Sequence, residues 1–177
     1  MQGIPLNERK RLGALLDDRP QTEVMAMIPQ FSQAETDNFV APPAQIPEAL
    51  GVLMFNMERG VNLPEIQEFL RDCPDIQPFD VILANELDDG CARSGNKNTA
   101  RELAQAFGLN YAWGLEFIEL VNDENAKGFH GNAVFSRWPI RRAGVIRLPE
   151  QYNWYFDRQK RIGGRLAVFA GRGGGGV

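Results

Sequence analysis

Two short apolar runs, separated by a segment with room for one helix, constrain the fold of this chain more than any other feature. The runs are VLMF at 52–55 and VILA at 81–84. Short continuous apolar runs are typical of strands that are buried on both faces. The segment 56–80 between them carries helix signals, with Asn62 as a cap and Pro64 in the first turn. The pattern therefore predicts a parallel strand–helix–strand unit.

A second helix and four more strands are predicted after this unit. The segment NTARELAQAFG places Thr99 and Glu102 in capping-box spacing, repeats apolar residues at helical spacing and stops at Gly108. Strand patterns then follow one another, and they are YAWGLEFIELV (111–121), GNAVFSRWP (131–139), AGVIRL (143–148) and GGRLAVFA (163–170). Helices between strands early and strands alone later predict an α/β fold with a mixed sheet and helices on a face.

The 177 residues are one domain's worth of chain, which we divide into three segments. Residues 1–48 are expected to form a peripheral arm, with a short helix around Leu6–Leu16 and a Pro-rich connector. Residues 49–170 hold the domain. Residues 171–177 form a Gly-rich tail that resembles translated low-complexity or out-of-frame DNA. The tail matches G-x-G-x-x-G, but no chain remains to form the helix that a dinucleotide site needs.

Composition indicates a globular chain, with 44% apolar and 24% charged residues. No apolar run is long enough to cross a bilayer, and the N-terminus lacks the apolar centre of a signal peptide. Cys73 and Cys91 are too few for a disulfide framework and lack metal-site spacing, so we expect reduced thiols in a cytoplasmic protein.

The net charge of −4 is distributed unevenly along the chain. Residues 1–136 hold 10 Lys/Arg against 21 Asp/Glu, a net of −11, and residues 137–177 hold 9 against 2, a net of +7. An acidic metal site facing a basic phosphate-binding side would produce this split. A basic edge that packs against acidic chain elsewhere would produce it equally well.

Polar side chains follow both members of the predicted parallel strand pair. Asn56 and Glu58 follow the first strand, and Asn85, Glu86, Asp88 and Asp89 follow the second. Carboxyl ends of parallel strands are where α/β sheets build their sites, and Mg²⁺ prefers carboxylates, waters and substrate phosphate as ligands. The pattern predicts a Mg²⁺ or Mn²⁺ site, and a solvated acidic turn is the alternative that it leaves open.

Four segments in order resemble the endonuclease/exonuclease/phosphatase superfamily, which has the DNase I-like fold. They are GVLMFNMERG, DVILANELDDG, the stretch RSGNKNTARELAQAFGLNYAWGLEFIEL and GNAVFSRWPI, and the match covers roughly residues 51–170. The resemblance implies a Mg²⁺-dependent hydrolase of phosphate esters, with Glu86 on the metal and Asn56 holding the phosphate. It also implies a second-ligand role for Glu58 and substrate-binding roles for Asn132 and Arg137.

Other acidic and ionisable residues receive lesser roles from the same resemblance. Asn85 stands where the family usually has glutamine. Asp88 and Asp89 are expected to be outer-shell or turn residues. His130, the one histidine of the chain, lies before the GNAVFS strand, where the family places no catalytic histidine, so we expect a loop residue near the rim of the site.

The second half of the family pattern is absent, because the chain has no T-H-L-like strand, no later Asp-x-Asn pair and no S-D-H. The expected fold is therefore the first sheet of a DNase I-like α/β sandwich with its helices, as in a truncated and catalytically incomplete enzyme. Two hypotheses follow: a phosphodiesterase acting on nucleic acid, phospholipid or inositol phosphate, or a non-catalytic fragment that binds phosphate-bearing ligands. A lone sheet would also expose an apolar face through which the chain could self-associate.

Overall fold

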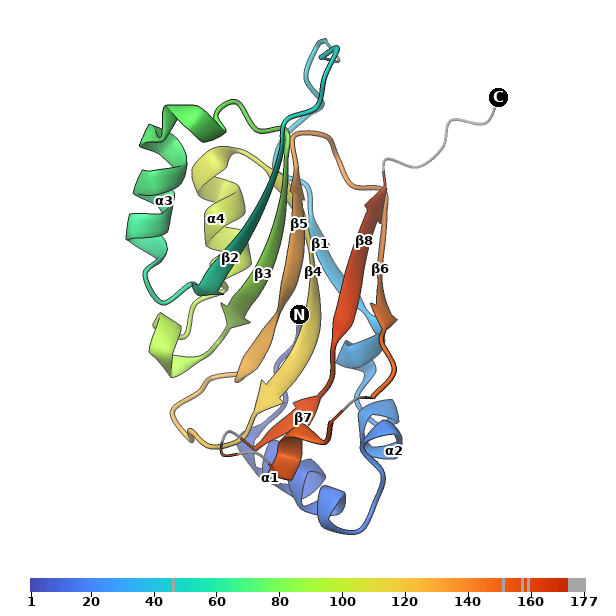
Figure 1. The fold of residues 1–177 in the computed structure, drawn as a ribbon. Helices are drawn as coiled ribbons and strands as arrows, with labels where there is room; N and C mark the ends of the chain where they lie inside the picture. The colour runs from blue at the N-terminus through green and yellow to red at the C-terminus, as the bar shows by residue number, and fades with distance from the viewer. Residues whose placement is uncertain (46, 151, 157, 159, 172–177) are drawn as a thin grey trace, which may run out of the picture.

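The structure, a computed structural model, describes residues 1–45, 47–150, 152–156, 158 and 160–171. Its main element is a six-stranded mixed sheet in the order β1-β4-β5-β3-β2, with β7 also paired to β4; β6 and β8 form a separate two-stranded sheet (Figure 1). The strands are β1 (Ala34–Asp37), β2 (Val52–Arg59), β3 (Val81–Asp89), β4 (Asn110–Glu119), β5 (Phe129–Ser136), β6 (Arg142–Arg147), β7 (Arg161–Gly163) and β8 (Leu166–Gly171). The α-helices are α1 (Leu6–Ala14), α2 (Gln21–Ala26), α3 (Leu63–Asp72) and α4 (Thr99–Phe107).

The predicted strand–helix–strand unit is confirmed, because β2 and β3 pair in parallel and α3 connects them. The expectation that both strands are buried on two faces is wrong. The strand β2 lies at the edge of the sheet, and Val52 and Met54 are 57% and 73% exposed. Leu83 on β3 is 39% exposed on its open face, whereas Ile82 and Ala84 lie in the core. Both strands thus alternate between a helix-covered face and an open one.

The helix α4 confirms the second predicted helix, with one difference at its start. The side chain of Asn98, rather than that of Thr99, caps the helix by accepting a hydrogen bond from the Arg101 backbone N–H. Thr99 instead donates its hydroxyl to the backbone carbonyl of Asp88, which ties the helix to β3. The helix ends at Gly108 in the left-handed conformation, with φ of 58°.

The N-terminal segment is part of the core and not a peripheral arm. The predicted helix is present as α1, and Leu12, Val24 and Phe31 belong to the main hydrophobic cluster. The strand β1 then adds to the sheet by pairing antiparallel with β4. The helices within 1–32 are short, so their apolar residues do not repeat often enough to form a clear helical pattern. This is why the burial of the segment was not predicted.

The β6–β8 sheet packs against the middle of the large sheet, on the side away from α3 and α4 (Figure 1). The two sheets approach each other closely at Gly114 of β4, where an added Cβ would lie 2.6 Å from Val145 and 2.9 Å from Val168. Glycine at this position therefore allows the two sheets to come together. Because β6 and β8 cover β4 and β5 but not β2, the open face of β2 and β3 remains exposed.

Three sequence expectations concern the chain as a whole. No helix in the described part of the chain is both long and apolar enough to span a membrane. Cys73 and Cys91 are free thiols, and burial raises the pKa of Cys91. Of the Gly-rich tail, Gly171 ends β8, and 172–177 lie outside the described residues.

Candidate functional site

Two β-bulges lie side by side where β2 and β3 reach their polar residues. On β3, Ala84 pairs with Ala133 and Leu87 with Gly131, so Asn85 and Glu86 together oppose the single residue 132 of β5. On the other side of β3, the register with β2 also shifts, between Asn56 and Arg59. Bulges of this kind redirect side chains and recur beside active sites.

The redirected side chains surround a polar hollow of about 300 Å³. It includes three of the predicted site residues, Asn56, Glu86 and Asn132, which come from three different strands. The remaining lining residues are Asn85, Glu116, Leu148, Arg165 and Leu166. We call this set the polar hollow. The small sheet contributes Leu166 and thereby closes the hollow over the bulges.

Glu86 occupies a backbone conformation that favours glycine, with φ of 57°. This conformation costs a non-glycine residue about 1–2 kcal/mol. The backbone N–H of Glu86 donates to Oδ1 of Asn132 at 3.1 Å, which holds the bulge in place. The side chain is half-buried, and no described residue forms an ion pair or hydrogen bond with its carboxylate. Strain combined with an unpaired carboxylate is typical of a functional position.

Two asparagine side chains beside Glu86 are oriented by backbone N–H groups. Oδ1 of Asn56 accepts from the N–H of Glu58 at 2.8 Å, as Oδ1 of Asn132 does from that of Glu86. No described residue accepts a hydrogen bond from either Nδ2 group. Both amides are thus fixed by their oxygens, and their nitrogens can donate to an anion.

Glu116 is a site residue that the sequence interpretation missed. Its side chain, 2% exposed, lines the polar hollow from β4. Oε1 lies 3.1 Å from a guanidinium nitrogen of Arg165, and Oε2 lies 3.9 Å from Nε2 of His130. A signal was present in the sequence, because Glu116 interrupts the otherwise apolar run WGLEFI. A charge in a fully buried strand requires a partner or a function.

Two predicted residues lie outside the polar hollow. Glu58 is exposed on the bulge of β2, and its backbone N–H donates a hydrogen bond to Oδ1 of Asn56. Glu58 is not among the residues that line the polar hollow. Arg137 follows the end of β5 that pairs with the start of β3, and its guanidinium donates to Asp80 at 2.8 Å. Glu86 lies toward the opposite end of that strand.

Asp88 and Asp89 are not turn residues, because both are buried within β3. Asp88 is fully buried and accepts two hydrogen bonds from Arg93, at 2.7 and 2.8 Å. Asp89 pairs with Lys127 at 2.8 Å. Burial alone would raise the pKa of Asp88, but the hydrogen bonds from His130 and Arg93 outweigh it and hold the pKa below its ordinary value.

His130 is likewise not a loop residue at a rim. It lies in β5, is 4% exposed, and its Nδ1 is 2.9 Å from Oδ1 of Asp88. An ionised carboxylate can only accept, so Nδ1 carries the proton and Nε2 faces Glu116. The strand pattern was predicted to begin at Gly131, and the structure extends it by two residues.

The basic C-terminal part of the chain pairs with acidic residues of the first part. Arg137 contacts Asp80, Arg165 contacts Glu116, and Arg161 lies 3.3 Å from Glu119. Internal pairing therefore accounts for a share of the charge asymmetry. Arg165 is the member of this set that also lines the polar hollow.

The donors of the polar hollow suit a hard divalent cation only in part. Among the described residues, no group of three or more Asp, Glu, His or Cys side chains is arranged to hold a metal ion. The hollow does hold two carboxylates, Glu86 and Glu116, together with amide oxygens. Mg²⁺ commonly takes one or two carboxylates and completes its shell with waters and substrate phosphate. The residues fit such an ion as partial ligands and not as a full protein cage.

Comparisons with protein-family models, with curated proteins and with solved structures find no match to this chain.

Proposed function

We propose that the polar hollow is the site of a metal-dependent phosphoesterase, in which Glu86 binds Mg²⁺ or Mn²⁺. The observation that carries the proposal is the unpaired Glu86 carboxylate on a strained bulge, facing the same hollow as Asn56 and Asn132. Glu58 on the neighbouring bulge also has a positive φ, of 46°, but it is exposed and lies outside the polar hollow. Glu86 is half-buried beside the oriented amides of Asn56 and Asn132, so a cation bound to it would lie close to groups that can donate to a phosphate.

We propose in the same way that the fold is the first part of a DNase I-like α/β sandwich. In support, helices α3 and α4 lie on one side of the large sheet and a second sheet lies on the other (Figure 1). The segments that resemble the superfamily occupy β2, β3, α4, β4 and β5, and the four strands among these elements each contribute a residue to the polar hollow.

The reaction is hydrolysis of a phosphate ester. Oxygen from water forms a bond to phosphorus, one ester P–O bond breaks, and the alcohol leaves with a proton that derives from the water. A divalent cation would supply charge stabilisation to the phosphoryl and leaving oxygens. Glu86 would hold the cation, while the Nδ2 groups of Asn56 and Asn132 would donate to phosphoryl oxygens. Glu116 is the carboxylate placed to accept a proton from the water.

The test is cleavage of bis(p-nitrophenyl) phosphate by the full chain with Mg²⁺ or Mn²⁺. We expect metal-dependent release of p-nitrophenolate, and Glu86→Gln should lower kcat/KM by about 10²-fold or more. Glu58→Gln is the matched control, because it removes an exposed carboxylate outside the polar hollow, and kcat/KM should stay within about twofold. Equal effects of the two substitutions, or no metal-dependent turnover by the wild-type chain, would contradict the proposal.

A second candidate function, a non-catalytic interaction fragment, is favoured by one observation. Val52, Met54 and Leu83 leave an apolar strip exposed on the open face of β2 and β3. The chain would then bind a partner or a second copy of itself through that strip. Inactivity on phosphate esters together with concentration-dependent self-association would favour this candidate over the phosphoesterase.

A further inference from the structure

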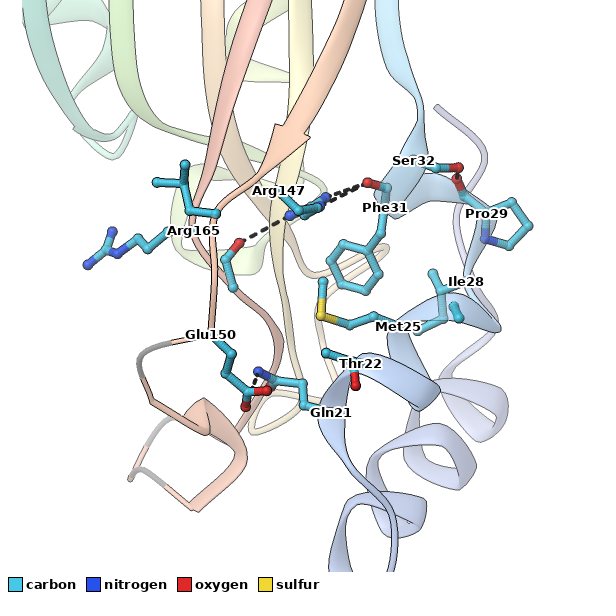
Figure 2. A pocket seen from close by; sticks show the side chains of 13 residues that line it. Gln21, Thr22, Met25, Ile28, Pro29, Phe31, Ser32, Arg147, Glu150 and Arg165 are labelled. Atoms are coloured by element: carbon cyan, nitrogen blue, oxygen red, sulfur yellow. Dashed lines mark hydrogen bonds between the residues drawn. The ribbon is translucent and has the colours of Figure 1, made fainter.

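A second hollow of about 300 Å³ lies next to the polar hollow and has a different character (Figure 2). Its walls come from α2, the turn at Pro29–Ser32 and the end of β6. The apolar side chains that line it include Met25, Ala26, Ile28, Phe31 and Leu148. We call it the apolar hollow. A volume of this size is at the lower end of small-molecule sites, which run from about 300 to 1,000 Å³.

The polar groups of the apolar hollow are largely occupied by other parts of the protein. The guanidinium of Arg147 lies 4.7 Å from the centre of the Phe31 ring and donates to the carbonyls of Phe31, Leu115 and Gly164. The hydroxyl of Ser32 donates to the Pro29 carbonyl at 2.9 Å.

At the mouth of the apolar hollow, Gln21 donates to Glu150 at 3.1 Å, as Figure 2 shows. Burial also lowers the pKa of Arg147 to about 10, because removal from water disfavours the charged guanidinium. With these groups engaged, the surface left for a ligand is mainly apolar, so recognition there depends on apolar burial.

The two hollows share two lining residues, Leu148 and Arg165. The backbone N–H of Leu148 donates to the Arg165 carbonyl at 3.0 Å, so the pair forms a low wall with one hollow on each side. Leu148 is 47% exposed and the Arg165 side chain is 54% exposed. A ligand that occupied both hollows would therefore lie against these two exposed side chains.

We infer that the substrate of the proposed phosphoesterase is an amphipathic phosphodiester, whose phosphate lies in the polar hollow and whose alkyl chain lies in the apolar hollow. The position of the phosphate in this inference rests on the proposed function. The position of the alkyl chain rests on the apolar hollow. The wall of Leu148 and Arg165 suits such a molecule. Leu148 can contact the start of the alkyl chain, and the cation of Arg165 can contact the phosphate to which that alkyl chain is attached.

The first arm of the test compares p-nitrophenyl octyl phosphate with p-nitrophenyl methyl phosphate in the presence of Mg²⁺. We expect kcat/KM to be at least about tenfold higher for the octyl ester. Ala26→Trp should abolish this preference by filling the apolar hollow, so that the octyl and methyl esters turn over with similar kcat/KM. Met27→Trp is the matched control, because Met27 is 44% exposed, adjoins Ala26 and does not line the apolar hollow. Glu86→Gln should remove turnover of both esters.

The second arm measures binding of octyl phosphate and methyl phosphate by calorimetry without a divalent cation. Octyl phosphate should bind at least about tenfold more tightly, and Ala26→Trp but not Met27→Trp should remove the difference. Turnover that depends on Glu86 with no octyl preference would overturn the inference and leave the phosphoesterase intact. Absence of turnover would overturn both the proposed phosphoesterase activity and the inferred substrate. If octyl phosphate still bound selectively in that case, the apolar hollow would be a site for apolar ligands only.

Discussion

Glu86 and Asp88 are two residues apart on the same strand, yet their surroundings differ in almost every respect. Asp88 is fully buried and bonded to Arg93, His130 and Ser94. Glu86 is half-buried, has no described partner for its carboxylate and sits on a strained bulge. The comparison teaches that one buried carboxylate is held in place by its hydrogen bonds, whereas a carboxylate without such bonds at a strained position is available for a ligand.

The largest expected effect comes from removing the buried carboxylate. Asp88→Ala removes the acceptor of His130 and of two of the three hydrogen bonds of Arg93, and breaking a buried pair in this way costs about 3–5 kcal/mol. Glu86→Ala removes no bond of the side chain and should change the free energy of unfolding by less than about 1 kcal/mol. Urea denaturation of both variants measures the difference. Similar losses of stability in the two variants would contradict the distinction between the two carboxylates.

The next largest effect should be a loss of the stability that ionised Asp88 contributes, when the pH is lowered. Because hydrogen bonds hold the pKa of Asp88 below its ordinary value of 3.8, its ionised form stabilises the folded state fully above that value. This contribution is lost as the pH falls through the lower, folded-state pKa. Asp88→Asn should therefore flatten the dependence of unfolding free energy on pH below 3.8. Chemical denaturation from pH 6 to pH 2 checks this, and an unchanged slope would count against it.

The smallest expected effect concerns the anchor of the bulge. Asn132→Ala removes the acceptor for the Glu86 N–H and should cost about 1 kcal/mol of stability. If Glu86 binds a cation, the same change should weaken Mg²⁺ affinity by about 10-fold, because outer residues orient the ligand. Asn85→Ala, which lines the polar hollow without holding that N–H, is the control, with Mg²⁺ titration calorimetry as the measurement. Equal weakening in both variants would argue against an anchoring role.

Local pattern was sufficient to predict the strand–helix–strand unit, α4 and the later strands. Each of these depends on spacing within one segment, as with Gly108 at the end of α4. The same patterns also placed Asn56, Glu86 and Asn132 on the strands whose ends form the polar hollow. Partners distant in sequence decided the rest, as when β1 joined β4 and brought the N-terminal segment into the core.

The bulge on β3 is the main reason that the acidic residues could not be assigned from sequence. Ile82 and Ala84 before the bulge and Leu87 after it all belong to the hydrophobic core. One extra residue therefore reverses the alternation of the strand, so Asp88 lies on the face opposite to the one that regular alternation would assign. Glu116 was missed for a different reason, because its position in the polar hollow depends on how β4 lies against β5 and β8.

The pairing of β1 with β4 also has a consequence for the order of folding during synthesis. Ala34 pairs with Gly114, and the whole of β2, α3, β3 and α4 lies between them in the chain. The strand β1 is made before β4, yet it has no strand to join until β4 has left the ribosome. Contacts this distant in sequence slow folding. The parallel pair of β2 and β3 can form before β4 is made, so β1 joins the sheet after two strands that follow it in the chain.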